Sequence, residues 1–177
     1  MGSARDLRIV CPHGSNGCMN DRLVFPSVDF PAYPELSVSK PDGWVGLAAT
    51  GLPLALAKTV EPGTFRPNVL VSLQRFGVDF SDDAAIKALN AKLKKLTRFK
   101  ESSRHVTEDS AGTQVVVDGR FAGPRGEMFV HCVRIIVIKR EYVYDVVEIT
   151  GTASALTGDN GLEEIREIVL SVTSQVS

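Results

Sequence analysis

The amino-acid sequence predicts an α+β domain in which a single antiparallel β-sheet is flanked by two main helices. Three observations lead to this fold class. Segments with strand character come in runs, two amphipathic helices stand between and after these runs, and a short polar link joins the last two strands. A doubly wound parallel sheet would instead show strands and helices in strict alternation. The composition, with 44% hydrophobic and 23% charged residues, is that of an ordinary globular domain with one core.

The first third of the chain reads as an extended segment followed by strands. Prolines are frequent in residues 19–43, which predicts an extended path over a surface that ends in the turn Pro41-Asp42-Gly43. Strand material begins at Trp44 and continues through a loosely alternating stretch up to Ala57. The next strand is predicted from Asn68 to Phe76, because its apolar residues alternate along one face.

The first helix is predicted to begin at Ser81, a residue type that caps helix N-termini well. Asp82 and Asp83 follow, and acidic groups suit the positive end of the helix dipole. The helix is expected to end near residues 98–100, where basic residues complement the last carbonyls. Its apolar stripe consists of Ile86, Leu89, Leu93 and Leu96.

Four more strands and a final helix follow. The strands are expected near residues 103–108, 113–121, 127–139 and 142–150. The polar link Lys139-Arg140-Glu141 is short, so the last two strands should form an antiparallel hairpin. The final helix is expected over residues 161–173, with Asn160 and Glu163 as a capping box. Its buried stripe is expected to be Leu162, Ile165, Ile168, Val169 and Val172.

These elements divide the chain into two parts. Residues 1–34 are expected to be an extended, partly disordered N-terminal segment, and residues 35–177 a single domain. Three interpretations of Cys11 and Cys18 stay open: a disordered leader, a disulfide between them, and a metal site with His13. The third cysteine, Cys132, lies in an apolar run and is expected to be buried.

Charge and hydropathy exclude several classes of protein. No apolar run approaches the roughly 20 residues of a membrane span. The pI of about 6.3 argues against a dedicated nucleic-acid binder, which usually carries a basic excess. No secretory signal is visible, so the expected location is cytoplasmic as the chain is written, or the cell envelope if a leader was removed.

Three short elements resemble the PsbP-like fold, shared by photosystem PsbP proteins, Ran-binding Mog proteins and actinobacterial LpqN lipoproteins. The resemblance covers about residues 35–176, and the LpqN branch looks nearest, although the lipoprotein leader of that branch is missing here. It implies an α/β/α sandwich, an actinobacterial source and a non-catalytic binding or accessory role. The three elements are Pro41-Asp42-Gly43-Trp44 after a short strand, Arg66-Pro67-Asn68-Val69-Leu70-Val71 before the first helix, and the long hairpin from Glu127 to Thr150 before the last helix.

A search for catalytic patterns finds no phosphate-binding loop, dinucleotide fingerprint or nucleophile elbow, and no cofactor is expected. His105 is interpreted as a solvated strand residue, and His131 as a hydrogen-bonded histidine that is either buried or at a sheet edge. In a regular strand His131 and Cys132 point to opposite faces, so they cannot form a dyad. Asp145 and Glu148 likewise point to opposite faces of their strand, so they cannot form a carboxylate pair on one face.

Two features are candidates for a binding surface. Trp44, the only tryptophan, is either a core residue at a sheet edge or one wall of a pocket with Phe65 and Phe76. The other feature is a basic helix, which is either a solvated helix back or a surface for an acidic protein or an anionic lipid. Its candidate residues are Lys87, Lys94, Lys95, Arg98 and Lys100.

The sequence therefore predicts a binding or accessory protein that recognises a protein partner or a lipid-like ligand. Two alternatives remain: an enzyme with an unrecognised site around His131 and Trp44, and a chaperone of secretion effectors. The oligomeric state is left open.

Overall fold

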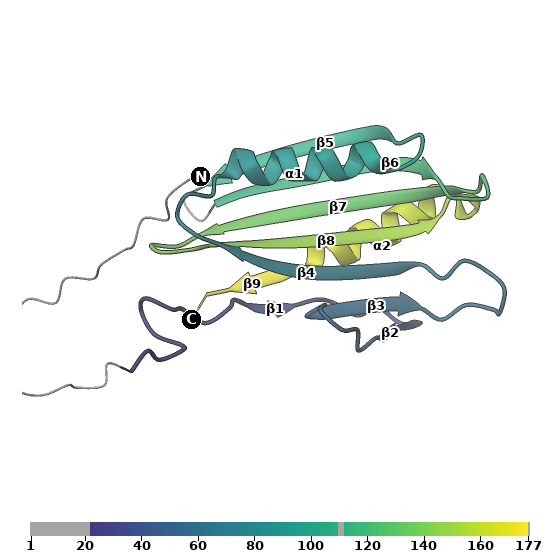
Figure 1. The fold of residues 1–177 in the computed structure, drawn as a ribbon. Coiled ribbons are helices and arrows are strands. Elements are labelled where there is room, and N and C mark those ends of the chain that lie inside the picture. The colour runs from purple at the N-terminus through teal and green to yellow at the C-terminus, as the bar shows by residue number, and fades with distance from the viewer. Residues whose placement is uncertain (1–21, 110–111, 177) are drawn as a thin grey trace, which may run out of the picture.

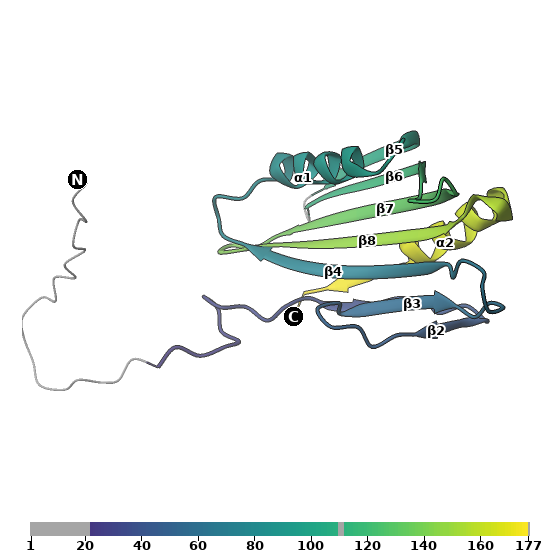
Figure 2. The ribbon, with the colours of Figure 1, turned by 45° about the vertical axis from the view of Figure 1, so that its right-hand side comes forward.

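The computed structural model describes residues 22–109 and 112–176 of the chain. Its main layer is a seven-stranded antiparallel sheet in the order β2-β3-β4-β8-β7-β6-β5, shown in Figure 1. The helices α1 (Asp82–Lys95) and α2 (Asp159–Ser171) pack on opposite faces of this sheet (Figure 2). The strands of the sheet are β2 (Trp44–Gly46), β3 (Leu54–Lys58), β4 (Asn68–Phe76), β5 (Lys100–Asp109), β6 (Gly112–Ala122), β7 (Met128–Lys139) and β8 (Tyr144–Ser154).

The α+β class and the largely antiparallel sheet agree with the sequence prediction, but the prediction of one single sheet was incomplete. A second, two-stranded sheet joins β1 (Glu35–Ser37) to β9 (Thr173–Gln175). The hydroxyl oxygens of Ser37 and Thr173 lie 2.7 Å apart across this pair. Strands of three residues are too short to show a periodicity, and their pairing joins the two ends of the domain.

Helix α1 begins where the sequence predicts it and ends earlier. The Ser81 side chain accepts a hydrogen bond from the backbone N–H of Ala84, which confirms the N-cap. Leu96 is already extended, and Arg98 adopts a positive φ of 55°, so the helix cannot reach residues 98–100. The buried side of α1 consists of Ala85, Leu89 and Leu93, which pack on valines and isoleucines of β6 and β7.

Helix α2 begins two residues before the predicted start, so the predicted capping box at Asn160 and Glu163 was wrong. The N-cap is Gly158, with a φ of 66° and no side-chain cap. The short 3-10 helix η1 (Ala155–Thr157) runs directly into this glycine, which places Asn160 inside the first turn. The predicted apolar stripe is otherwise correct, because Ile165, Ile168 and Val169 are fully buried against the sheet. Among the described residues, no helix is both long enough and apolar enough to cross a membrane.

Both faces of strand β7 are buried, which explains the long apolar run in the sequence. Cys132 and Ile136 belong to the cluster under α2, whereas Val133, Ile135 and Val137 belong to the cluster under α1. The neighbouring β8 pairs with β7 along its whole length in antiparallel register, as the predicted hairpin requires.

One glycine sets how closely α2 approaches β8. A Cβ atom at Gly151 would lie 3.0 Å from the Cβ of Ile165 and 3.1 Å from a methyl carbon of Val169. Both of these neighbours are fully buried core atoms that have little freedom to move away. The spacing between helix and sheet therefore depends on the absence of a side chain at this position.

We expect Gly151→Ala to lower the free energy of unfolding by about 1–3 kcal/mol, because the added methyl group overpacks the α2 face. Urea denaturation followed by circular dichroism measures this change. Gly46→Ala is the matched control, since a Cβ at this strand glycine meets no atom within 4 Å. Equal stabilities for the two variants would show that α2 can shift to accommodate the methyl group.

Candidate functional site

A pocket of about 800 Å³ opens at the end of the sheet where β8 runs into η1 and α2. Three further segments line it: the end of β3, the loop from β3 to β4, and the loop from β6 to β7. These segments are far apart in the sequence and meet at one end of the sheet in Figure 1. We call this cavity the end pocket. The largest apolar groups in its lining are Val60, Phe65, Pro67, Phe129 and Leu156.

The wall of the end pocket contains exposed apolar surface. The rings of Phe65 and Phe129 lie 4.5 Å apart between centres, and Phe65 is 39% exposed. Leu156 in η1 is 97% exposed, so its side chain has almost no contact with the rest of the chain. Apolar side chains gathered around an open concavity are typical of a site that binds an apolar group.

One side of the pocket carries a hydrogen-bonded charged group. The Lys58 ammonium donates to both carboxylate oxygens of Glu164 at 2.7 and 2.8 Å, and the Trp44 indole N–H donates to one of them at 3.0 Å. Burial by itself would raise the pKa of Glu164, but these hydrogen bonds outweigh it and lower the pKa. Glu164 is therefore a carboxylate whose oxygens are already engaged, which makes it a poor general acid.

The loop from β6 to β7 contributes Arg125 and Glu127 to the lining. The Glu127 carboxylate accepts a hydrogen bond from the backbone N–H of Arg125 at 2.9 Å. Within the described part of the chain, the Arg125 guanidinium has no hydrogen bond or ion pair of its own. The rim of the pocket thus offers one cationic group to an incoming anion.

Trp44 lies in the core rather than on the surface. Its side chain is 1% exposed and packs in the cluster under α2. It reaches the pocket only through its hydrogen bond to Glu164. Phe65 lines the pocket, whereas Phe76 stacks on Phe80 beside α1 and is not part of it. A role of Trp44 in ligand recognition stays a prediction.

The candidate basic residues are all exposed. Lys87, Lys94 and Lys95 point away from the buried side of α1, Arg98 lies in the turn after it, and Lys100 begins β5. In the described residues none of these five side chains forms a hydrogen bond or an ion pair. Lys92 differs, because it pairs with Glu148. These residues form a surface separate from the end pocket, and their proposed contact with a partner stays a prediction.

The remaining titratable candidates do not form a catalytic pair. His131 is buried, lies 3.0 Å from the Thr152 hydroxyl, and has a pKa that is lowered mainly by burial. Cys132 is fully buried, and burial raises the pKa of its thiol, which makes it a poor nucleophile. His105 is exposed, as expected. In the described residues no group of three or more histidine, cysteine or acidic side chains could hold a metal ion.

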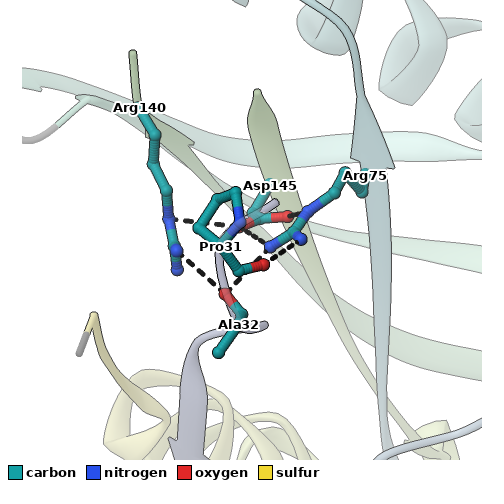
Figure 3. A network of polar contacts seen from close by, with 5 residues as sticks. All are labelled: Pro31, Ala32, Arg75, Arg140 and Asp145. Atoms are coloured by element: carbon teal, nitrogen blue, oxygen red, sulfur yellow. Dashed lines mark hydrogen bonds and ion pairs between the residues drawn. The ribbon is translucent and has the colours of Figure 1, made fainter. Parts of the chain in front are cut away.

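Asp145 and Glu148 are separate, as their parity predicts, and Asp145 belongs to a network that the sequence analysis missed (Figure 3). The fully buried Asp145 carboxylate accepts two hydrogen bonds from Arg75, at 2.7 and 2.8 Å, and lies 3.3 Å from Nε of Arg140. The hydrogen bond to Asp145 is the main cause of the raised pKa of Arg75. We call Arg75, Arg140 and Asp145 the latch.

The latch holds the N-terminal segment, residues 22–34, which we call the strap. Arg75 donates to the backbone carbonyls of Pro31 and Ala32, and Arg140 donates to that of Ala32 at 2.8 Å. The Arg75 guanidinium also lies 4.1 Å from the ring centre of Tyr33. Apolar packing contributes little, because the large apolar side chains of the strap are exposed. These are Leu23, Val24, Phe25, Val28, Phe30 and Tyr33.

Several functional residues could not be found from the sequence. Lys58 and Trp44 are cross-strand partners of β3 and β2, and Glu164 comes from α2, far along the chain. No spacing rule connects them. Arg75 and Asp145 are likewise cross-strand partners of β4 and β8. The cysteine pair Cys11 and Cys18 lies outside the described residues.

Comparisons with known proteins support the fold. No family model and no curated protein matches the chain. Among solved structures, LpqN of Mycobacterium tuberculosis, described as involved in cell envelope biogenesis, matches with 17% identity over 82% of this chain and 86% of its own, at a TM-score of 0.69. PsbP (CyanoP) of Synechocystis sp. PCC 6803 matches with 11% identity over 91% and 98%, at a TM-score of 0.52. The chain therefore has the PsbP-like fold.

We expect Arg75→Gln to lower the free energy of unfolding by about 3 kcal/mol, because it leaves a buried carboxylate with one cation instead of two. The strap should also detach, since two of its three carbonyl bonds are lost. Limited thermolysin digestion monitors this detachment through cleavage on the N-terminal side of Leu23 or Val28. Arg66→Gln is the matched control, because Arg66 is exposed and bonds only the Lys58 carbonyl at 2.9 Å. Unchanged cleavage in Arg75→Gln would mean that the latch does not hold the strap.

Proposed function

We propose that the protein is a non-catalytic binding protein and that its ligand site is the end pocket. The single observation that carries this proposal is the combination of an open apolar wall with a fixed charged group. Phe65 and Leu156 offer exposed apolar surface beside the buried ring of Phe129, whereas the charges of Lys58 and Glu164 already neutralise each other. Such a site suits an apolar chain with a polar head more than a reacting substrate.

The class of ligand that fits best is an amphiphile with an anionic head. The apolar wall would cover the chain of the ligand, and the Arg125 guanidinium at the rim would pair with the head. The involvement of LpqN in cell envelope biogenesis supports an accessory function with lipid-like molecules by analogy of fold alone. A location at the cell envelope and an actinobacterial source belong to the same proposal.

A catalytic alternative has less support. Trp44 packs in the cluster under α2, whereas His131 contacts Phe121 and Thr152 on the other face of the sheet. These two residues do not share one site. The engaged carboxylate of Glu164 and the raised thiol pKa of Cys132 also fit poorly with acid–base or nucleophilic chemistry.

Trp44 provides a direct test of ligand binding in the pocket. It is the only tryptophan, and its indole N–H bonds Glu164, which lines the pocket. We expect lauric acid, added below its micellar concentration, to change the intrinsic fluorescence with saturation. Phe65→Ala should weaken this binding about tenfold, because one aromatic wall of the site is lost.

Two comparisons make this test specific. Phe30→Ala removes an exposed phenylalanine of the strap and should leave the titration unchanged. Arg125→Gln should reduce the preference for lauric acid over lauryl alcohol, since only the acid carries a charge. A flat titration, or equal affinities in wild type and Phe65→Ala, would overturn the proposed site.

A second candidate function is recognition of an acidic protein partner through the basic residues around α1. The observation behind it is that Lys87, Lys94, Lys95, Arg98 and Lys100 are exposed and form no ion pair in the described residues. Unpaired charges of one sign raise the rate of encounter with an oppositely charged partner. A chaperone of secretion effectors would use the same kind of surface.

We expect a polyglutamate peptide to bind the protein at low salt and to dissociate as salt is added. The double variant Lys94→Glu, Lys95→Glu should abolish this binding in fluorescence anisotropy. The control is Arg22→Glu, Arg66→Glu, which makes the same charge change at exposed positions of the strap and of the loop between β3 and β4. If both double variants lose binding equally, only the net charge matters and no defined surface exists.

A further inference from the structure

Strand β5 is the long free edge of the main sheet. It pairs with β6 on one side, and in the described residues no strand pairs with its other side. The opposite edge of the sheet, β2, has only three residues, whereas β5 has ten. The outer side of β5 therefore presents a row of backbone groups that another extended strand can bind.

Apolar packing covers little of either face of β5. The buried cluster under α1 takes its sheet residues from β6, β7 and β8 and none from β5. In β5 only Ser103 and Arg104 are half-buried, and Val106 in the middle is 50% exposed. Backbone hydrogen bonds to β6 are the main contacts of this strand. A second strand paired on its outer edge would add about as many backbone hydrogen bonds as β5 makes now.

The charges of β5 are arranged so that the strand complements itself in antiparallel orientation. Its first half carries Lys100 and Arg104, and its last two residues are Glu108 and Asp109. Antiparallel pairing brings the first half of one strand opposite the last half of the other. Opposite charges at directly opposed positions stabilise such a pair, and like charges destabilise it.

One register of the pairing between two β5 strands brings opposite charges together and also brings exposed apolar side chains together. A two-fold axis perpendicular to the sheet must place a residue opposite its own copy. With Val106 on the axis, the two exposed valines meet, and each Arg104 lies opposite the Glu108 of the second copy. With Arg104 on the axis, two guanidinium groups would oppose each other. The pairing of β5 with β6 is irregular between Glu101 and Ser103. This irregularity lies at the end of the segment that would pair with the second copy.

The groups that this register needs are free to form the contact. Arg104 bonds Glu101 and Asn90 through Nε and Nη2, and its Nη1 makes no hydrogen bond in the described residues. Glu108 is exposed and has no ion pair there. An arginine can hold a second carboxylate through the remaining edge of its guanidinium.

We propose that the protein forms a homodimer in which β5 pairs antiparallel with β5 of a second copy, with Val106 on the two-fold axis. The interface is isologous, so it closes after two copies. It joins the two seven-stranded sheets into one continuous sheet. The end pocket lies at the ends of the strands, so this dimer leaves both pockets open and is independent of their ligand.

The test uses charge reversal in the full-length protein. We expect sedimentation equilibrium to show a dimer for the wild type. Arg104→Glu and Glu108→Arg should each weaken self-association about tenfold or more, because each creates two repulsive cross-strand pairs. An equimolar mixture of the two variants should restore the dimer. In a mixed dimer, the new carboxylate of one variant faces the new guanidinium of the other, and the two unchanged side chains also face each other with opposite charge.

Matched controls separate this result from a change in net charge or in folding. Lys87→Glu and Glu167→Arg make the same charge changes at exposed positions of α1 and α2 and should leave dimerisation unchanged. Thermal melts by circular dichroism confirm that every variant is folded. A wild type that stays monomeric over the whole concentration range, or variants that fail to complement each other in the mixture, would overturn the proposal.

Discussion

Burial of both faces of the central strands is the constraint on which the rest of this structure depends. β7 is apolar on both faces, and its neighbour β8 is buried mainly on the face toward α2, so each face of the sheet must be covered. Helix α1 covers one face through Ala85, Leu89 and Leu93, and α2 covers the other through Ile165, Ile168 and Val169. Gly151 allows the second of these contacts to be close.

The functional features lie where this double coverage stops. At one end of the sheet, the loops and the start of α2 surround an open pocket whose apolar wall no helix covers. Near the other end of β8, the buried Asp145 carboxylate is neutralised by two arginines, and their remaining donors hold the strap. At the β5 edge neither apolar cluster takes a buried residue from the strand. The candidate binding surfaces and the latch thus lie at the periphery, outside the apolar contacts between helices and sheet.

The sequence predicts the helices and strands well where apolar periodicity is strong. Ser81, the stripe through Leu89 and Leu93, and the opposite orientations of His131 and Cys132 all follow from local spacing. The start of α2 was misplaced because the preceding 3-10 turn and Gly158 replace a side-chain cap. The β1–β9 sheet was missed because three-residue strands carry no periodic pattern.

By itself, the sequence determined the α+β class, the order of the elements and the faces that they bury, because these depend on spacings of a few residues. It also drew attention to Trp44 and to the basic residues of α1. Only the tertiary structure decided that Trp44 is core and bonds Glu164, that Phe65 and Phe129 share a wall, and that Asp145 joins Arg75 and Arg140. Each of these contacts joins residues from separate elements. Local sequence propensity does not determine which separate elements come into contact.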